Sequence, residues 1–119
     1  MMSQALSGIK VIDVASVLAG PYATMLLGDM GANIIKIEPP IGDMMRKSPP
    51  FIGGESAYYL YANRNKRAMR LNLKTAEGKE VLFDLVKDAD IFIENWKPPT
   101  KTSLGIDYSV MQKINPKLI

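Results

Sequence analysis

The stretch KVIDVASVLAGPYATMLLGDMGANIIKI, residues 10–37, contains the pattern that decides the fold. Its first six residues, 10–15, form a β-branched run that predicts a strand. A helix is predicted from Pro21, because the first helical position needs no backbone N–H, and it ends at Gly31. This helix is apolar nearly all round, so we expect it to be largely buried. A second strand is predicted over 33–37, which gives a βαβ unit with parallel strands and a right-handed crossover.

The rest of the chain continues this alternation of strands and helices, with two long loops. We predict, in order, a loop at 38–57, a strand at 68–73, a helix capped by Thr75 at 75–87, a strand at 90–94, a loop at 95–105, a helix capped by Asp107 that ends near Asn115, and the first residues of a strand at 117–119. This order predicts an α/β fold, a Rossmann-like, doubly wound and mainly parallel sheet. Because the pattern stops where a strand begins, we expect the chain to be truncated and the sheet to be incomplete.

Composition removes several classes of chemistry. The chain has 119 residues, 47% of them apolar, which fits one domain or part of one. It has no Cys and no His, so it cannot build a disulfide, a thiolate nucleophile, an imidazole metal site or a Ser-His-Asp triad. A net charge of +3 is too small to indicate nucleic acid by itself. No targeting or membrane segment is visible, and we expect a cytoplasmic protein without a metal.

The turn after the first predicted strand, 17–21 (VLAGP), is the first candidate binding element. Ligands of open α/β sheets bind outside the carboxyl ends of the strands, and backbone amides at a helix start favour an anion. Small Ala19 and Gly20 would let a flat ring or a phosphate approach the backbone closely. A plain tight turn explains the same residues, and no G-x-G-x-x-G fingerprint supports a dinucleotide site.

Two further segments each allow more than one interpretation. Residues 63–67 (NRNKR) begin a basic run that extends to Lys74 and follows three Tyr. The run fits a solvated edge strand, a phosphate-bearing ligand or a nucleic acid. Residues 94–99 (ENWKPP) follow the fourth predicted strand. Trp96 could cover a ring and Lys97 could meet a phosphate, or Trp96 fills core while Lys97 is solvated.

The carboxylates indicate no catalytic pair. Asp13 lies within the first predicted strand, Asp29 lies near a helix end, and Asp43 lies in the long loop. We interpret each of them as structural or solvated, and we expect no catalytic residue among them.

Short segments along nearly the whole chain form a specific series when they are taken together. They are 6–13 (LSGIKVID), 17–21 (VLAGP), 27–38 (LGDMGANIIKIE), 42–43 (GD) with Arg46, 63–67 (NRNKR), 71–74 (LNLK), 89–90 (AD), 94–96 (ENW), 104–106 (LGI) and 115–119 (NPKLI). In this order and spacing they resemble the family III CoA-transferases, also called the CaiB/BaiF family.

The resemblance implies an enzymatic activity for which this chain would supply only part of the protein. Members of the family move CoA between carboxylic acids through a reactive Asp that forms covalent intermediates. In the family that Asp follows the segment matching 115–119, so we expect no catalytic residue here. Residues 1–119 would then be the N-terminal, CoA-binding part of the Rossmann-like large domain, inactive alone. The family also implies that the full-length protein is an interlocked homodimer.

The resemblance also implies which residues contact CoA. Val17, Ala19 and Leu71 match positions around the adenine, while Asn95, Trp96 and Lys97 match the stretch that meets the nucleotide and its phosphates. The partners are then an acyl-CoA and a carboxylic acid, with neither nucleic acid nor membrane. Two alternatives remain: the branch of the family that racemises 2-methylacyl-CoA esters, and a non-catalytic module that binds CoA or another nucleotide.

Overall fold

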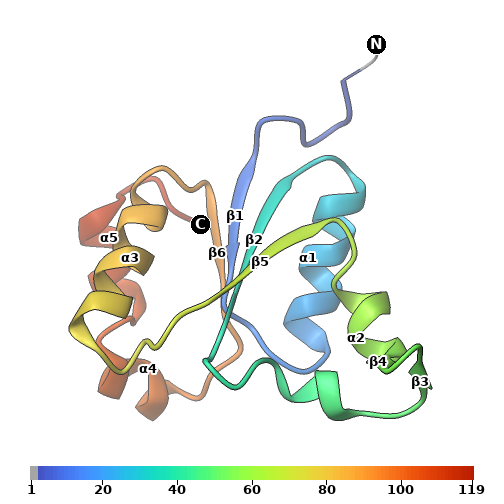
Figure 1. The fold of residues 1–119 in the computed structure, drawn as a ribbon. Coiled ribbons are helices and arrows are strands. Elements are labelled where there is room, and N and C mark those ends of the chain that lie inside the picture. Colours follow the sequence, from blue (N-terminus) through green and yellow to red (C-terminus); the bar gives the residue numbers. More distant parts are fainter. Residues whose placement is uncertain (1–2) are drawn as a thin grey trace.

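A four-stranded parallel sheet forms the centre of the computed structural model, which describes residues 3–119 (Figure 1). Its strands are β1 (Lys10–Asp13), β2 (Asn33–Glu38), β5 (Lys66–Arg70) and β6 (Ile91–Ile93), in the order β5-β2-β1-β6. Every neighbouring pair is parallel. The prediction of an α/β fold built on a parallel sheet is therefore confirmed.

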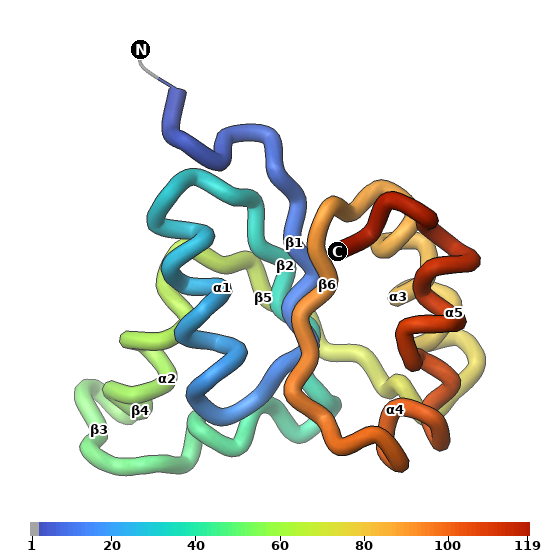
Figure 2. The backbone as a smooth tube through the Cα atoms, turned by 180° about the vertical axis from the view of Figure 1, so that it is seen from behind, coloured from blue at the N-terminus to red at the C-terminus, as the bar shows by residue number. Residues whose placement is uncertain are grey.

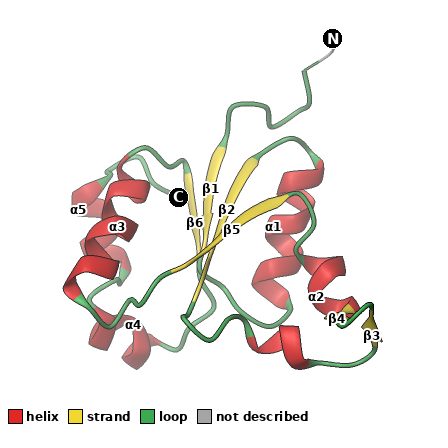
Figure 3. Cartoon of the chain, in the orientation of Figure 1, coloured by secondary structure: helices red, strands yellow, loops and turns green. Residues whose placement is uncertain are grey.

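Helices cover both faces of this sheet. One face carries α1 (Ala19–Asp29) and α2 (Ala57–Ala62), and the other carries α3 (Ala76–Lys87), α4 (Pro98–Leu104) and α5 (Tyr108–Ile114). The view from behind shows the same division (Figure 2). The carboxyl ends of the strands and the loops that follow them gather at one end of the molecule, at the bottom of Figure 3. That end is where the candidate site lies.

Alternation along the strands supplies a separate apolar core to each face. Ile12 and Val14 belong to the core beneath α3 and α5, together with Leu82, Val86 and Met111. The residues between them point the other way, because successive side chains of a strand alternate. Val11 packs with Ala32, Ile34 and Leu27 on the α1 face. Burial on both faces explains why β1 and β2 are so rich in Val and Ile.

The prediction of a structureless loop over 38–57 is wrong. This stretch contains the 3-10 helix η1 (Met44–Lys47) and a two-stranded antiparallel hairpin, β3 (Phe51–Ile52) and β4 (Glu55–Ser56), and it leads directly into α2. Side-chain caps start both helices: Asp43 accepts the Met45 N–H at 2.9 Å, and Ser56 accepts the Tyr59 N–H at 3.3 Å. These short elements contain turn-forming Gly and Pro and have no hydrophobic periodicity, so the sequence pattern did not indicate them.

Other predicted boundaries moved. The second predicted loop contains α4, because Pro98 and Pro99 occupy its first two positions, where no N–H is needed. Helix α1 begins at Ala19, two residues before Pro21, and β5 begins at Lys66 and ends at Arg70, overlapping only the first half of the predicted strand at 68–73. The helices capped by Thr75 and Asp107 are confirmed. Residues 117–119 form no assigned strand, although Ile119 exchanges backbone hydrogen bonds with Asp90 and Phe92 beside β6.

Helix α1 is less buried than its composition predicts. Leu18, Tyr22, Leu26 and Met30 follow one another at four-residue intervals and are each 40–43% exposed. Tyr61 of α2 stacks on Tyr22 with ring centroids 6.1 Å apart. One side of α1 packs on the sheet, and the other presents an apolar stripe. Within residues 3–119, no helix is long and apolar enough to cross a membrane.

Candidate functional site

The chain reverses its direction across the sheet between β1 and β6. From β1 it runs outward to β2 and then β5, and it returns to the other side of β1 to form β6. In open α/β sheets such a switch point separates the loops at the carboxyl ends and leaves a crevice for a ligand. The β1–α1 turn and the segment after β6 flank this position.

A cavity of about 560 Å³ opens at this end of the sheet. The loops that follow all four strands of the main sheet contribute to its lining. These are Val14 to Ser16 after β1, Pro39 to Met44 after β2, Leu71 to Lys74 after β5, and Trp96 with Thr100 and Leu104 after β6, and the last two residues of β2, Ile37 and Glu38, also line it. The walls are mostly apolar and carry one cationic side chain, Lys74. A mostly apolar concavity with few polar groups is typical of a small-molecule site.

The structure brings together only part of the predicted set. Leu71 and Trp96 line the cavity, and Trp96 also packs against the apolar core, as the core interpretation of this residue expects. Val17, Ala19, Asn95 and Lys97 are exposed and do not line it, although Val17 and Asn95 belong to the loops that flank it. These six positions stay predictions as CoA contacts.

Lys74 is a cavity residue that sequence reasoning did not single out as a ligand. It lies at the end of the basic run and three residues after Leu71, within the LNLK segment. The loop from β5 to α3 turns there, which places Lys74 on the same wall as Leu71. A position directly after a strand's carboxyl end was the signal that could have identified it.

Asn95 ties the two flanking loops together. Its Oδ1 accepts the Ser16 N–H at 3.0 Å, and its Nδ2 donates to the Ser16 carbonyl at 2.7 Å. The Asn95 amide thus pairs with the Ser16 backbone as a neighbouring strand would. It does so just beyond the last residues at which β1 and β6 pair. Its amide is fully engaged with the β1–α1 turn.

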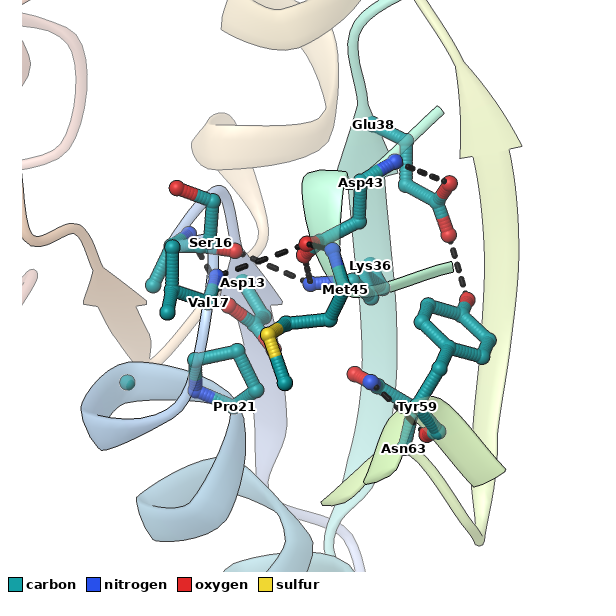
Figure 4. A network of polar contacts seen from close by, with 12 residues as sticks. Asp13, Ser16, Val17, Pro21, Lys36, Glu38, Asp43, Met45, Tyr59 and Asn63 are labelled. Carbon is teal, nitrogen blue, oxygen red and sulfur yellow. Dashed lines mark hydrogen bonds and ion pairs between the residues drawn. The ribbon is translucent and has the colours of Figure 1, made fainter. Parts of the chain in front are cut away.

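A buried ion pair lies behind the same turn. Lys36 Nζ is 3.1 Å from Asp43 Oδ2, and each side chain is only 1% exposed. Figure 4 shows this pair between the turn that carries Val17 and strand β2. Lys36 donates to the Ala15 carbonyl at 2.9 Å, and Asp43 Oδ1 accepts the Val17 N–H at 3.4 Å. The pair therefore joins β2 and its following loop to the turn.

Glu38 anchors the cavity wall formed by the loop after β2. Arg46 donates to both of its oxygens at 2.8 Å, and Tyr59 also donates to it. Burial alone would raise the pKa of Glu38, but hydrogen bonds from Arg46, Tyr59 and the Asp43 amide outweigh burial and lower it to about 2. Burial and the Glu38 carboxylate raise the pKa of Tyr59. Glu38 is thus a fixed anion and Tyr59 a fixed donor.

Several side chains of the basic run make ion pairs or hydrogen bonds within the fold. Lys66 is buried against Asp13 at 3.0 Å, and burial lowers its pKa while the Asp13 charge opposes that shift. Arg64 pairs with Asp29 at 2.6 Å, and Arg67 donates to Asn33 at 3.0 Å. Lys66 is not the solvated residue that the edge-strand interpretation expects, and its burial removes one cation from the exposed part of the run.

The acidic residues at and near the cavity are engaged within the fold. The two in the cavity lining, Glu38 and Asp43, are both engaged in ion pairs, and Asp13 lies under α1, where Thr24 donates to it at 2.6 Å. All three carboxylates thus have partners within the fold. What faces the space is apolar surface, an indole, a lysine and backbone, which suits a ligand with a flat ring and anionic groups.

Comparisons with known proteins agree with this geometry. The family model described as CoA-transferase family III matches residues 6–119. The chain is 44% identical over 116 residues to human succinyl-CoA:glutarate CoA-transferase, covering 96% of this chain and 26% of that protein. It is 42% identical over 113 residues to acetyl-CoA:oxalate CoA-transferase of Acetobacter aceti, covering 94% of this chain and 29% of that protein.

Solved structures give the same result for the fold. A crystal structure of a CaiB/BaiF family protein from Brucella suis superposes with a TM-score of 0.93 at 39% identity, covering 99% of this chain and 32% of that one. The chain therefore spans less than a third of the length of these relatives.

Proposed function

This chain belongs to CoA-transferase family III, and we propose that it supplies the part of such an enzyme that binds the nucleotide end of CoA. The observation that carries the proposal is the cavity at the switch point, where Leu71, Trp96 and Lys74 converge. An adenine ring suits the apolar wall and the indole, and a phosphate suits the lysine.

The flanking residues complete the proposed site. Val17 and Asn95 lie on the two loops that flank it, Ala19 is the first residue of α1, and exposed Lys97 is the N-cap of α4. We place the adenine between the β1–α1 turn and Leu71, and the phosphates toward the two lysines. Asn95 acts chiefly through Ser16, because both ends of its amide are engaged there.

The full reaction proposed is the transfer of CoA between two carboxylic acids. An aspartate outside residues 1–119 would attack the acyl-CoA carbonyl and release the CoA thiolate, giving a mixed anhydride. The thiolate would then attack the aspartyl carbonyl and release the donor acid, leaving an aspartyl-CoA thioester. The acceptor acid would repeat these steps in reverse.

Short dicarboxylic acids are the proposed substrate class. The human relative is named for succinyl-CoA and glutarate, and the Acetobacter aceti relative for oxalate. A third relative, from Haloarcula marismortui and 46% identical over 120 residues, is named for succinyl-CoA and mesaconate. Each of these names includes a dicarboxylic acid.

Assembly belongs to the proposal as well. We propose that the complete protein is an interlocked homodimer and that the remaining chain covers the apolar stripe on α1. Sedimentation of the protein as its gene encodes it should then give the mass of two chains. A single-chain mass would contradict this part of the proposal alone.

Calorimetric titration with CoA tests the central claim. We expect CoA to bind, dephospho-CoA to bind more weakly and pantetheine to bind least, because only CoA carries every phosphate. Lys74→Ala should weaken CoA binding by about tenfold through the loss of a charged hydrogen bond. Lys113→Ala, an exposed lysine on α5 outside the cavity lining, is the matched control. Equal binding of CoA and pantetheine would refute a nucleotide site.

A further inference from the structure

Side chains from outside the β1–α1 turn hold its backbone at three consecutive residues. Lys36 binds the Ala15 carbonyl at 2.9 Å, Asn95 binds both polar groups of Ser16, and Asp43 accepts the Val17 N–H at 3.4 Å. A turn of this kind ordinarily satisfies such groups with water or with its own residues. Here β2, the loop after β2 and the segment after β6 all converge on it.

Val17 has a backbone conformation that a valine rarely adopts. Its φ is +67°, and among the described non-glycine residues only Asn65 shares a positive φ. For a β-branched residue this left-handed conformation is strained, and it persists only where the surroundings impose it. The hydrogen bond from Val17 to Asp43 lies directly at the strained residue.

Stability gives no evident reason for an ion pair at this place. Lys36 and Asp43 are almost completely buried, and removing two charges from water offsets most of their attraction. Apolar side chains of similar volume would pack at least as well in many such sites. The charged groups instead make directional hydrogen bonds to the backbone. The Lys36 ammonium donates to the Ala15 carbonyl, and the Asp43 carboxylate accepts the N–H groups of Val17 and Met45.

We propose that Lys36 and Asp43 are positioning residues for the nucleotide site. The pair fixes both ends of residues 15–17 and keeps Val17 left-handed, so that the cavity wall formed by Ala15 and Ser16 is in place before a ligand arrives. A preformed wall improves affinity because binding then needs no ordering of the turn. This inference rests on the proposed binding of CoA.

A double-mutant cycle between Asp43 and Val17 tests it. Glycine adopts a positive φ without strain, so Val17→Gly removes the need for the turn to be held. We expect Asp43→Asn to weaken CoA binding about tenfold in the Val17 background and less than about twofold in the Val17→Gly background. An equal loss in both backgrounds would show a general structural role and overturn the proposal.

Amide hydrogen exchange supplies a readout that does not depend on CoA. In Asp43→Asn the remaining oxygen can face Lys36 only if the NH2 group faces the Val17 N–H, which then has no acceptor. The substitution should therefore speed exchange at Val17 and leave the amides of α3 unchanged; unchanged exchange at Val17 would overturn the proposal. If the unaltered protein bound no CoA, the proposed function would fail, while exchange would still decide whether the pair holds the turn.

A second variant covers the case in which Asp43→Asn does not fold. Lys36→Met combined with Asp43→Leu removes both charges and the acceptor of the Val17 N–H together, so no buried charge is left unpaired. We expect this protein to fold, to bind CoA about tenfold more weakly and to exchange faster at Val17. Failure of both variants to fold would overturn the proposal, because the pair would then serve the fold itself.

Discussion

The side-chain amide of Asn95 makes two hydrogen bonds with the backbone of Ser16, from a position 79 residues away in the sequence. Neither β1 nor β6 extends this far, so the amide continues their pairing by one step across the switch point of the sheet. These bonds therefore hold the segment after β6 against the β1–α1 turn, which carries the cavity residue Ser16. The effect of removing the two Asn95–Ser16 hydrogen bonds can be measured.

Asn95→Ala should lower both stability and affinity. Loss of two hydrogen bonds at a partly exposed site should reduce the free energy of unfolding by about 1–2 kcal/mol. CoA should bind several-fold more weakly because the β1–α1 turn is released. Denaturant titration and calorimetry measure the two effects. Asn33→Ala is the control, since the Asn33 side chain is also exposed and accepts a hydrogen bond from Arg67 far from the β1–α1 turn. An equal loss of CoA affinity in Asn33→Ala would contradict the role proposed for the Asn95–Ser16 hydrogen bonds.

Trp96 should report ligand binding directly. It is the only Trp, and it lies half-buried in the cavity lining. An adenine or a phosphate that enters the cavity changes the polarity around the indole, so CoA should shift or quench its fluorescence in a saturable way. Trp96→Phe should abolish the signal and retain much of the binding by calorimetry. A titration that leaves the emission spectrum unchanged would exclude a ligand beside Trp96.

The order of the four strands of the main sheet and of helices α1, α3 and α5 was predictable because it depends on local patterns. Runs such as 10–15, and caps such as Thr75 and Asp107, carry their information within a few residues. The 3-10 helix and the hairpin of residues 38–57 escaped prediction because elements of two to four residues have no periodicity to detect. The exposed apolar side of α1 was not predicted either, because a helix that is apolar nearly all round does not show which side packs on the sheet.

The site was predictable to the level of its loops but not of its contacts. Placement after a predicted strand singled out the segment of Trp96, and the family resemblance singled out Leu71; both residues line the cavity. No local pattern could show that Lys36 faces Asp43 or that Asn95 faces Ser16, since these pairs depend on tertiary packing. Lys66 looked like one more surface cation, and only the fold shows that it is buried against Asp13.

Removal of the Lys66 charge should destabilise the fold strongly. Its Nζ donates to Asp13 at 3.0 Å, to Asn63 at 2.9 Å and to the Pro21 carbonyl at 2.8 Å. Lys66→Met would leave the Asp13 carboxylate buried without a counter-charge, which should cost about 3–5 kcal/mol in denaturant titration. Lys87→Met, in an exposed pair with Asp84, should change little.

The partner substitution separates charge from packing. Lys66→Met combined with Asp13→Asn removes both buried charges and should recover much of the lost stability, since Asn can still accept the Thr24 hydroxyl. If the double variant were as unstable as Lys66→Met alone, then lost packing or the lost bond to Pro21 would account for the effect, and the charge explanation would be wrong.

Acid should weaken the fold through Glu38. Its pKa is 4.5 in the unfolded reference and about 2 in the folded protein, so the unfolded chain takes up the proton first as the pH falls. The stability from its bonds to Arg46 and Tyr59 is therefore fully present above pH 4.5 and is lost progressively between about 4.5 and 2. The shift corresponds to about 3 kcal/mol, because each pKa unit is worth about 1.4 kcal/mol.

Denaturant titrations at a series of pH values from 7 to 2.5 measure this loss. Glu38→Gln should be less stable than the unaltered protein at pH 7, because a neutral amide binds Arg46 more weakly than a carboxylate does. The same variant should lose less stability on acidification, so the two curves converge toward low pH. Glu77→Gln, an exposed acid in the first turn of α3, should parallel the unaltered protein. Parallel curves for Glu38→Gln as well would assign the acid sensitivity to other carboxylates.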